Sequence, residues 1–520
     1  MNRKERRAQG ASAPQAAPAM SAPFVQLFNE ALGLHQAGKL PEAEERYRRA
    51  LAINSNIPLL YNNFGVCLYA QGKHDEAIVM QKKAIALDPK MDMSHNNMGV
   101  VLNALGRHKE ALEAFSKAIA LDPMNYQAIN NFGDSSVKSS LFEQGLKALH
   151  RSLEIKPDYV EALTNLGAAL WDLGRLDEAK VHLRRAIQLQ PDVAMAHKNL
   201  GIISLLQGNY AEGWREYDWR WLADKIQPKQ HPKPIWTGAD LGEGALLAWC
   251  EQGIGDEILH ASMIGDFARL GRFKRLVWEC DFRLATLLAR SNPGVEFVPR
   301  PPVIGDPSDS RIFAPDIAAQ IPTGSIGNFV RSDISKFPKH NGYLVPDPVR
   351  VEAFRQRLKT KPGEKLIGMS WLSKNAAFGS SKSTTLAQWA EILRTPGCKF
   401  VDLQYGDTEE ERAALTRDLG ITLEHIDGLD LKFDMEGLAA LTKACDLVTT
   451  VSNSAAHMAA AVGTPVWTLI ASGIGKFWYW GFDGATTVWY PSVTLIRQPE
   501  GENWEGSLKI IAERLRAFAA

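Results

Sequence analysis

Residues 58–72 read PLLYNNFGVCLYAQG, residues 92–106 read DMSHNNMGVVLNALG, and the second stretch repeats the first at a step of 34 residues. Three series keep this step: the glycines Gly65, Gly99, Gly133, Gly167 and Gly201; the prolines Pro89, Pro123, Pro157 and Pro191; and Ala84, Ala118 and Ala186, with Ser152 in the weak copy. A small residue lets two helices approach closely, and a proline ends the second helix because it cannot continue one. The pattern predicts a stack of helix–turn–helix units.

The step of 34 with these residues is identified as that of tetratricopeptide repeats. A first, imperfect repeat spans about residues 24–57, repeats two to five run to about residue 193, and the sixth leaves the pattern after Gly208. Because one repeat cannot bury its own apolar face, we expect the repeats to stack into an α-solenoid. The fourth copy has Ser140 and Gly145 where the others have glycine and alanine, which predicts a weak point or a bend.

A second series of asparagines lies two residues before each glycine: Asn63, Asn97, Asn131, Asn165 and Asn199. Asparagine is a mediocre helix former, so its recurrence needs a reason. A column of amides could pair with the backbone of an extended peptide, and here the chain resembles the repeat region of O-GlcNAc transferases, which implies a protein or peptide acceptor in the groove. The alternative is helix–helix hydrogen bonding within the solenoid.

Composition excludes several classes of partner. The chain has 520 residues, 45% apolar and 23% charged, with a formal net charge of zero. A neutral chain gives no electrostatic reason to expect nucleic acid or an anionic membrane. No run of about 18 apolar residues predicts a membrane span. The five cysteines lack CxxC spacing, so we expect no metal site, no disulfide framework and a reducing compartment.

The N-terminus is basic, MNRKERRAQG, and Ala-, Pro- and Ser-rich residues follow to residue 23. Because no apolar core follows the basic residues, residues 1–23 are predicted to be a disordered tail rather than a signal peptide. We therefore expect a cytoplasmic protein.

The repeats end in an aromatic helix. The stretch NYAEGWREYDWRW bunches Trp214, Tyr217, Trp219 and Trp221. Such a cluster at the end of a solenoid usually buries against the next domain, which predicts a docking helix; a ligand platform is the alternative. The repeats with this helix are assigned to residues 24–223, and residues 224–242, rich in Pro, Lys and Gly, to a linker.

After the linker the pattern changes to strands that alternate with helices, which predicts parallel α/β sheets. In residues 243–345 we expect strands at 245–251, 275–280 and 295–300 with helices from 256 to about 270 and from 282 to 290; residues 301–345 are not interpreted. In residues 346–520 we expect strands at 365–371, 399–405, 423–427, 447–451 and 465–471, with helices at 386–393, 409–418, 435–445, 455–461 and 504–519. Two Rossmann-like lobes indicate a site in the cleft between them.

The first candidate site is the turn Glu251-Gln252-Gly253-Ile254-Gly255-Asp256 after the first strand. Its glycines let the backbone approach a ligand, and the helix that begins there offers unpaired N–H groups. Asp256, at the carboxyl end of the strand, is placed where a general base would lie. An N-terminal helix cap is the alternative role for this carboxylate.

The second candidate is VSNSAAHMAAAVGTP, residues 451–465. Polar residues open a helix of small residues, whose N-terminus can hold a diphosphate through its dipole and free N–H groups. His457 lies in the first turn. In the alternative, Ser452 and Ser454 only cap the helix and His457 is a buried histidine with its hydrogen bonds satisfied.

Together the two stretches resemble the heptosyltransferase-like enzymes of glycosyltransferase family 9, and the closest resemblance is to bacterial proteins that fuse tetratricopeptide repeats to this domain. Gly255-Asp256 matches the family's Gly-Asp turn, and residues 452–465 match its histidine helix. The GWxxYxxRW helix, EQGxGD and LQYGD (residues 403–407) are shared with the fusion proteins. The resemblance implies an α-solenoid followed by a two-lobed α/β domain of the GT-B type.

The resemblance also implies the site residues. Asp256 would be the catalytic base, and the donor would be bound by Gly253, Gly255, Ser370, Ser373, Lys374, Lys382, Tyr405, Gly406, Ser452, Asn453, Ser454 and His457. Lysines in loops are usually solvated, which is the alternative for Lys374 and Lys382. The family usually has aspartate where Ser452 stands, so the residue predicts either a different sugar, with Asn453 taking over its hydrogen bonds, or an inactive copy.

We therefore expect an inverting, metal-independent glycosyltransferase that uses a nucleotide sugar as co-substrate and no other cofactor. No DxD motif stands at a strand end, because Asp427, Asp430 and Asp434 have the wrong spacing. The acceptor would be a protein held by the repeats, and the resemblance suggests flagellin. The alternative is a tetratricopeptide scaffold whose transferase-like domain is inactive.

Overall fold

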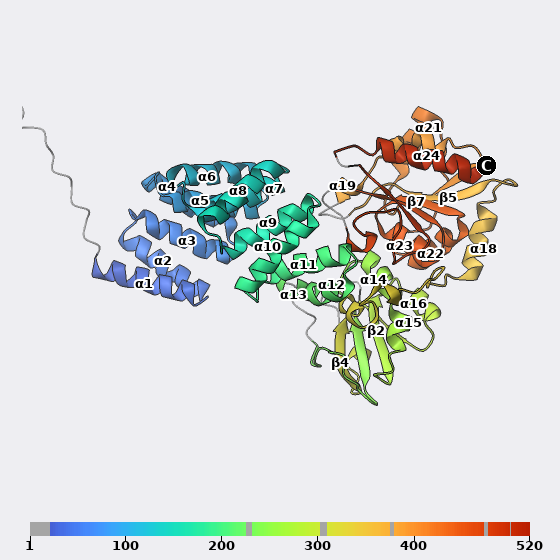
Figure 1. Ribbon diagram of the computed structural model, residues 1–520, viewed down its shortest axis with the longest axis horizontal. Helices are drawn as coiled ribbons and strands as arrows, with labels where there is room; N and C mark the ends of the chain where they lie inside the picture. The colour runs from blue at the N-terminus through green and yellow to red at the C-terminus, as the bar shows by residue number, and fades with distance from the viewer. Residues whose placement is uncertain (1–20, 225–230, 302–308, 375–378, 473–476, 500) are drawn as a thin grey trace, which may run out of the picture. The chain divides into compact units, whose positions relative to one another are not determined.

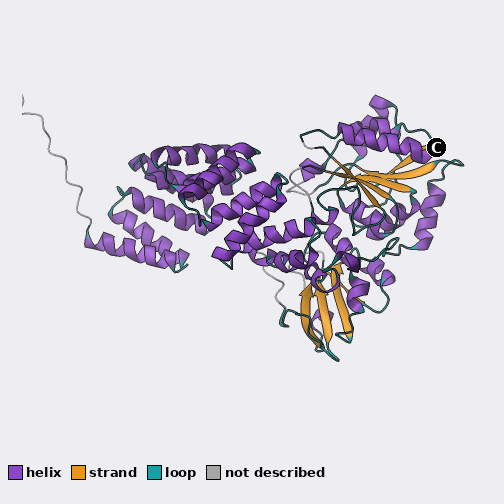
Figure 2. Ribbon diagram, viewed as in Figure 1, coloured by secondary structure: helices purple, strands orange, loops and turns teal. Residues whose placement is uncertain are grey.

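The structure is a computed structural model that describes residues 21–224, 231–301, 309–374, 379–472, 477–499 and 501–520. The chain divides into two compact units, Met1–Ala169 and Leu170–Ala520. Strands occur only in the second of these, between residues 245 and 497 of the described chain (Figure 2).

The first unit is built from helix pairs, and it confirms the repeats (Figure 1). Its helices are α1 (Ala22–Gln36), α2 (Leu40–Ile53), α3 (Pro58–Ala70), α4 (His74–Leu87), α5 (Asp92–Ala104), α6 (His108–Leu121), α7 (Tyr126–Lys138), α8 (Phe142–Ile155) and the start of α9 (Val160–Asp172). The helices α4 and α6 end two residues before Pro89 and Pro123, as the sequence predicts.

The glycine series marks where paired helices touch. A Cβ placed on Gly99 of α5 would lie 2.5 Å from a ring carbon of Phe115 on α6, and one on Gly133 of α7 would lie 2.8 Å from Leu149 on α8. Both distances are too short for a real Cβ, so glycine is required by the helix spacing. The predicted role of these small residues is confirmed.

Ser140 carries the irregularity of the fourth repeat. Its φ is +62°, the only positive value among the described residues other than glycine, whereas Gly72 and Gly106 occupy the equivalent turns with φ of +77° and +72°. A side chain in this left-handed region costs about 1–2 kcal/mol. The weak point predicted here is therefore local backbone strain at one turn.

We expect Ser140→Gly to raise the free energy of unfolding of the first unit by about 1 kcal/mol, because glycine adopts this conformation without strain. Urea unfolding followed by far-UV circular dichroism measures the change. Ser139→Gly is the matched control: Ser139 has φ −91° and its hydroxyl donates to the Ser135 carbonyl, so this variant should lose stability. Equal effects of the two variants would contradict the strain.

The second unit begins with the remaining repeat helices and continues into two parallel sheets. Its first helices are α10 (Leu176–Leu189), α11 (Ala194–Leu206), α12 (Tyr210–Tyr217) and α13 (Arg220–Ala223). The first sheet, in the order β3-β2-β1-β4, contains β1 (Ala245–Trp249), β2 (Arg275–Asp281), β3 (Glu296–Arg300) and β4 (Ile317–Pro322). It is accompanied by α14 (Ile254–Ala261), α15 (Ile264–Ala268), α16 (Ala285–Ser291), α17 (Gly327–Val330) and the 3-10 helices η2 (Ser310–Phe313), η3 (Thr323–Ser325) and η4 (Ile334–Lys336).

The second sheet, in the order β6-β5-β7-β8-β9, contains β5 (Lys365–Ser370), β6 (Cys398–Asp402), β7 (Leu447–Val451), β8 (Val466–Ile470) and β9 (Val493–Arg497). Its helices are α18 (Pro348–Arg357), α19 (Gly379–Lys382), α20 (Ala390–Leu393), α21 (Glu409–Leu419), α22 (Met435–Ala444), α23 (Ser454–Ala461), α24 (Glu505–Ala519), η5 (Leu386–Trp389) and η6 (Trp478–Trp480). Figure 1 shows α21 and α24 on one side of this sheet and α22 and α23 on the other. All pairings in both sheets are parallel, as predicted.

Two secondary-structure predictions are wrong, and two strands were not predicted. The strand expected at 423–427 is a single bridge between Val401 and Glu424; β6 ends at Asp402, whose carboxylate accepts from the backbone N–H of Gln404 and turns the chain away. The helix expected to run to residue 270 is broken into α14 and α15. The strand β4 lies in residues 301–345, which were not interpreted from the sequence, and β9 was not predicted because VTLIR is short.

The aromatic helix α12 is buried in the second unit, as predicted. Trp214 is fully buried, lies against Gly327 of α17, and packs edge-on to Trp478 with ring centroids 5.2 Å apart. Its indole N–H donates to the Arg331 carbonyl at 3.0 Å. One apolar core therefore joins the last repeat helices to both sheets.

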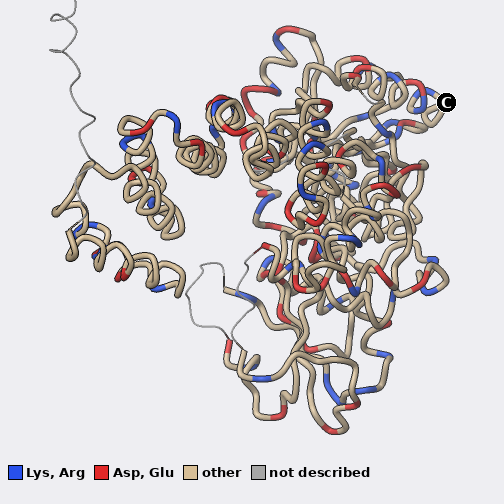
Figure 3. Tube along the Cα trace, turned by 60° about the vertical axis from the view of Figure 1, so that its left-hand side comes forward, with Lys and Arg blue, Asp and Glu red and all other residues tan. Residues whose placement is uncertain are grey.

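The chain just before β1 also packs onto the first sheet. The side chain of Trp236 is 3% exposed, and its backbone N–H donates to the Gln320 carbonyl of β4 at 2.7 Å. Charges of both signs are interspersed along the described trace, in keeping with the zero net charge (Figure 3).

Candidate active site

Asp256 lies in the first turn of α14, just after β1. Gly253 is the N-cap residue of this helix, so Asp256 does not occupy the cap position. Burial raises the pKa of the Asp256 carboxyl to about 6 and the charge of Glu251 adds to this, while the backbone N–H of Gly253 and the cation of Lys382 oppose it. A carboxylate with this pKa is a competent general base near neutral pH.

His457 faces Asp256's helix from the second lobe. A Cβ on Gly255 would lie 3.2 Å from Cδ2 of His457, so α14 and α23 approach closely because residue 255 is glycine. The Nδ1 atom of His457 is 2.7 Å from the Tyr490 hydroxyl. Burial lowers the pKa of His457 to about 3, and the positive charges of Lys382 and His260 act in the same direction. The imidazole is therefore neutral at physiological pH and acts through hydrogen bonds.

Lys382 lies near both Asp256 and His457. Its side chain is 5% exposed, and Nζ lies 4.5 Å from the ring centroid of Phe477. Burial lowers the pKa of Lys382 to about 8, and the nearby charge of Asp256 raises it. Lys382 remains mostly protonated at pH 7, so the alternative of a solvated loop lysine does not hold for it. The structure thus brings Asp256, Lys382 and His457 together.

A buried polar network supports the carboxyl ends of β5 and β7. Asn453 Nδ2 donates to the Ser370 hydroxyl at 2.7 Å, and that hydroxyl donates to Gln404 Oε1 at 2.8 Å. Asn453 Oδ1 accepts from the Ala455 backbone N–H and so caps α23. Ser370 is fully buried, which makes it a support of the α23 N-terminus rather than a surface for a ligand.

Ser452 and Ser454 differ in their surroundings. The buried hydroxyl of Ser452 accepts a hydrogen bond from the Trp480 indole N–H at 2.8 Å. Ser454 is the first residue of α23 and is partly exposed. The position that holds an acid in the resembling family is therefore occupied here by a serine paired with an aromatic residue.

The remaining predicted residues form a second group after β5 and β6. The Lys374 backbone N–H donates to the Tyr405 hydroxyl at 3.0 Å, and the Ser373 backbone N–H donates to Ser383 at 2.9 Å. Gly406 has φ +93°, and the Lys374 side chain lies directly against it. Of these residues only Gly406 lines a cavity of 450 Å³, whose other lining residues are Gln404, Asp407, His425, Gly428, Leu429, Asp430 and Leu431.

Three tyrosines lie near Asp256; Tyr479 and Tyr490 were missed in the sequence, and Tyr217 was assigned only to the aromatic helix. The charge of Asp256 is among the causes that raise the pKa values of Tyr217, Tyr479 and Tyr490, after burial as the largest. Tyr479 and Tyr490 also flank the His457 ring, with centroids 5.0 and 5.6 Å away. The aromatic runs at 478–480 and 489–490 were the available signal.

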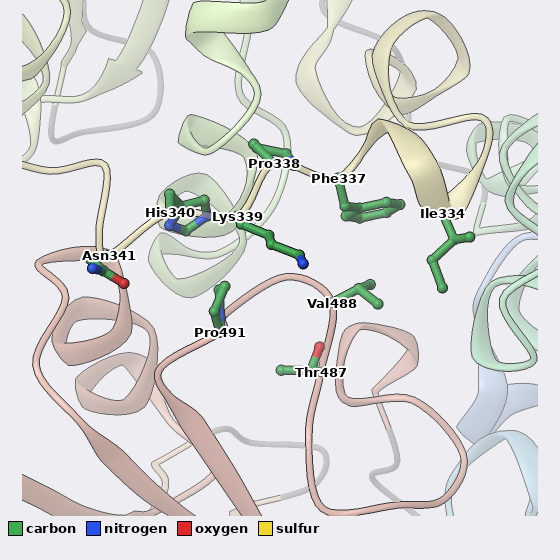
Figure 4. Close-up of a pocket in the computed structure, with 9 residues that line it drawn as sticks. All are labelled: Ile334, Phe337, Pro338, Lys339, His340, Asn341, Thr487, Val488 and Pro491. Carbon is green, nitrogen blue, oxygen red and sulfur yellow. The ribbon is translucent and has the colours of Figure 1, made fainter.

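A cavity of 610 Å³ lies elsewhere in the second unit (Figure 4). It is lined by Ile334, Phe337, Pro338, Lys339, His340, Asn341, Thr487, Val488 and Pro491. Phe337 packs against Tyr210 of α12 and Trp489, with centroids 4.7 and 4.8 Å away. None of the residues singled out in the sequence lines it.

The asparagine series in the first unit is hydrogen-bonded to itself. The ladder amides donate to the asparagine 35 residues earlier: Asn97 to Asn62 at 2.9 Å, Asn131 to Asn96 at 3.0 Å and Asn165 to Asn130 at 3.0 Å. Asn63 accepts from Asn62 at 3.1 Å. Asn199, in the second unit, is 5% exposed. The helix–helix role left open by the sequence is thus present for Asn97, Asn131 and Asn165.

Within the described residues, no three histidine, cysteine or acidic side chains gather as metal ligands would, and no helix has the length and apolarity to cross a bilayer. All five cysteines are free thiols. Asp434, one of the aspartates considered for a metal motif, caps α22 and pairs with Arg350.

Comparison with known families identifies the repeats. One family model described as tetratricopeptide repeat matches residues 93–125 and 160–193, and a second of the same description matches residues 28–92. These segments are tetratricopeptide repeats, a class of protein-interaction module.

A curated relative covers a larger part of the chain. Protein FlbA of Caulobacter vibrioides is 36% identical over 337 residues, which are 61% of this chain and 54% of FlbA. The chain spans about half the length of this relative. Among solved structures, MamA from Desulfovibrio magneticus RS-1 is 20% identical over 34% of this chain and 99% of its own, with a TM-score of 0.30. Pseudomonas aeruginosa PilF is 19% identical over 40% of this chain and 93% of its own, with a TM-score of 0.34.

Proposed function

We propose that this protein is an inverting, metal-independent glycosyltransferase of the GT-B type. The observation that carries the proposal is the group formed by Asp256, Lys382 and His457, in which a carboxylate with a raised pKa lies beside a buried cation. The two parallel sheets, with α14 and α23 meeting after the carboxyl ends of β1 and β7, support a GT-B arrangement.

The chemistry follows from the charges. The Asp256 carboxylate takes the proton of the acceptor, and the acceptor atom attacks the anomeric carbon of a nucleotide sugar as the bond to the diphosphate oxygen breaks. The leaving diphosphate carries negative charge, which Lys382 and the N-terminal N–H groups of α23 stabilise. Neutral His457 offers Nε2 for a hydrogen bond, while its Nδ1 is held by Tyr490.

For the acceptor we propose a protein segment that the repeats hold, with flagellin as the first substrate to test. Tetratricopeptide repeats bind peptides, and we expect the second N–H of each donating ladder amide to meet a peptide carbonyl.

Binding of nucleotides tests the donor site. We expect one nucleoside diphosphate from a panel to stabilise the pure protein by about 2.7 kcal/mol at 100 times its dissociation constant. Lys382→Ala should abolish this stabilisation, because a cation opposite the diphosphate is lost. Binding should weaken as pH rises through about 8, where Lys382 loses its proton. Thermal unfolding and titration calorimetry measure both effects.

Lys399→Ala is the matched control. Lys399 lies at the start of β6, away from the carboxyl ends of the strands, and pairs with Glu424 at 3.3 Å. This variant should bind nucleotide as the wild type does. Unchanged binding in Lys382→Ala would remove the lysine from the donor site, and no binding of any nucleotide or nucleotide sugar would refute the transferase.

A scaffold with an inactive transferase-like domain is the second proposal. The pairing of Ser452 with Trp480 favours it, because this position offers no carboxylate to the donor. The scaffold proposal predicts that the repeats bind a protein and that no nucleotide-sugar donor supports sugar transfer.

A further inference from the structure

The turn that carries Asp256 is held by the last repeat helices. Arg220 of α13 is 2% exposed, and its guanidinium donates to both carboxylate oxygens of Glu251, with Nε 3.2 Å from Oε2 and Nη2 2.5 Å from Oε1. Such a two-pronged pair fixes the direction as well as the position of the carboxylate. Glu251 lies five residues before Asp256 in the same turn.

A second contact reaches the next residue of the turn. Gln252 Nε2 donates to the hydroxyl of Tyr217 at 2.9 Å. The Tyr217 ring packs under the Arg220 guanidinium, with 4.9 Å between Cζ and the ring centroid. Glu251 and Gln252, consecutive residues of the turn, are therefore hydrogen-bonded to Arg220 and Tyr217, which form a cation–π pair.

Residues of η3 also bind Glu251 and Arg220. The Gly324 backbone N–H donates to Glu251 Oε1 at 3.0 Å, and Ser325 binds both Asp218 and Arg220. A Cβ on Gly324 would lie against the Glu251 carboxylate, so the side chain fills its site completely. The turn lies between α12–α13 on one side and η3 on the other.

We propose that Tyr217 and Arg220 are positioning residues for Asp256, so that the last repeat helices are part of the catalytic unit. This inference rests on the proposed function, because Asp256 is the base only if the protein is a transferase. A displacement of about 1 Å at a catalytic group can cost about 100-fold in rate. The aromatic helices that end the repeat region would thus set the geometry of the chemistry.

Tyr217→Phe in the full chain is the sharpest test, because it removes one hydroxyl and keeps the ring. We expect kcat to fall about tenfold with the KM for the nucleotide sugar unchanged, since the turn loosens while the donor site after β5 and β7 stays intact. Arg220→Lys keeps the charge but not the two-pronged geometry, so a similar loss is expected. Arg215→Ala is the control. It removes a 67% exposed arginine from α12, the helix that carries Tyr217, and it should behave as the wild type.

Hydrogen–deuterium exchange gives a readout that does not need activity. Amides of residues 252–257 should exchange about five- to tenfold faster in Tyr217→Phe than in Arg215→Ala, the change expected from one lost hydrogen bond. Unchanged exchange, or faster exchange with unchanged kcat, overturns the positioning role. A wild type that transfers no sugar overturns the proposed function instead, and the exchange result then decides the contact on its own.

Discussion

Asp256→Asn is expected to lower kcat for sugar transfer by about 100- to 10,000-fold, the usual contribution of a general base. Asparagine keeps the size of the side chain but cannot accept the acceptor's proton. Nucleotide binding should persist, because Lys382 and the α23 N-terminus remain in place; loss of the Asp256 charge lowers the pKa of Lys382, so binding is measured below pH 7. Transfer of radiolabelled sugar measures the rate, and calorimetry measures the binding.

The pH profile gives the same experiment a second readout. The base works in its deprotonated form, so kcat/KM should rise as pH passes about 6, the pKa of Asp256. The lysine works in its protonated form, so the rate should fall as pH passes about 8, the pKa of Lys382. A maximum near pH 7 follows, and the acidic limb should vanish in Asp256→Asn.

Asp418→Asn is the control for the carboxylate change. Asp418 is 59% exposed on α21 and pairs with Arg417. Its variant should retain the full rate and both limbs of the profile. Wild-type activity in Asp256→Asn would remove this residue from the role of base, and another group would have to take the acceptor's proton.

The largest effect on stability is expected for Trp214→Ala, a loss of about 3–5 kcal/mol from the second unit. The substitution empties a fully buried site against Gly327, Trp478 and Trp489, and it leaves the Arg331 carbonyl without its indole donor. Leu222→Ala, at a side chain that is 67% exposed, should change stability by less than about 0.5 kcal/mol.

The distribution of tryptophan makes this measurement selective. All 14 tryptophans lie at residue 171 or later, so tryptophan fluorescence follows the second unit alone, while circular dichroism follows both. In Trp214→Ala the fluorescence transition should move to lower urea, and the dichroism of the first unit should keep its midpoint. An unmoved fluorescence transition would show that the α12 contact contributes little.

The sequence predicts the repeats well because their helix–helix contacts join residues that are close in the chain. Gly99 and Phe115 are 16 residues apart, and the step of 34 repeats the same contact along the chain. Most strands are predicted for the same reason, since an apolar run such as ALLAW is by itself typical of a buried strand. No prediction was made for β4, because it lies in a stretch rich in proline and glycine and forms by pairing with β1.

The sequence predicts only those residues of the candidate site that stand in a recognisable motif. Asp256 and His457 stand in recognisable motifs, whereas Tyr217 on one side of Asp256 in the chain, and Tyr479 and Tyr490 on the other, reach the same place from distant residues. Likewise the partner of Ser452, Trp480, is set by the packing of η6 and not by any spacing. Contacts that depend on how remote segments fold together leave no periodic trace in a single sequence.

The asparagine ladder has a consequence for how such a chain can change over generations. Each donating amide meets an asparagine 35 positions earlier, and Asn62, Asn96 and Asn130 are interchangeable in that role. Excision of residues 92–125 by unequal recombination would set Asn131 against Asn62 and recreate the same bond. Duplication of one unit would do likewise. The asparagine ladder therefore keeps its own hydrogen bonds when whole modules are gained or lost, whereas pairs that occur at one junction, such as Asn103 with Asp134, are not conserved by such an exchange.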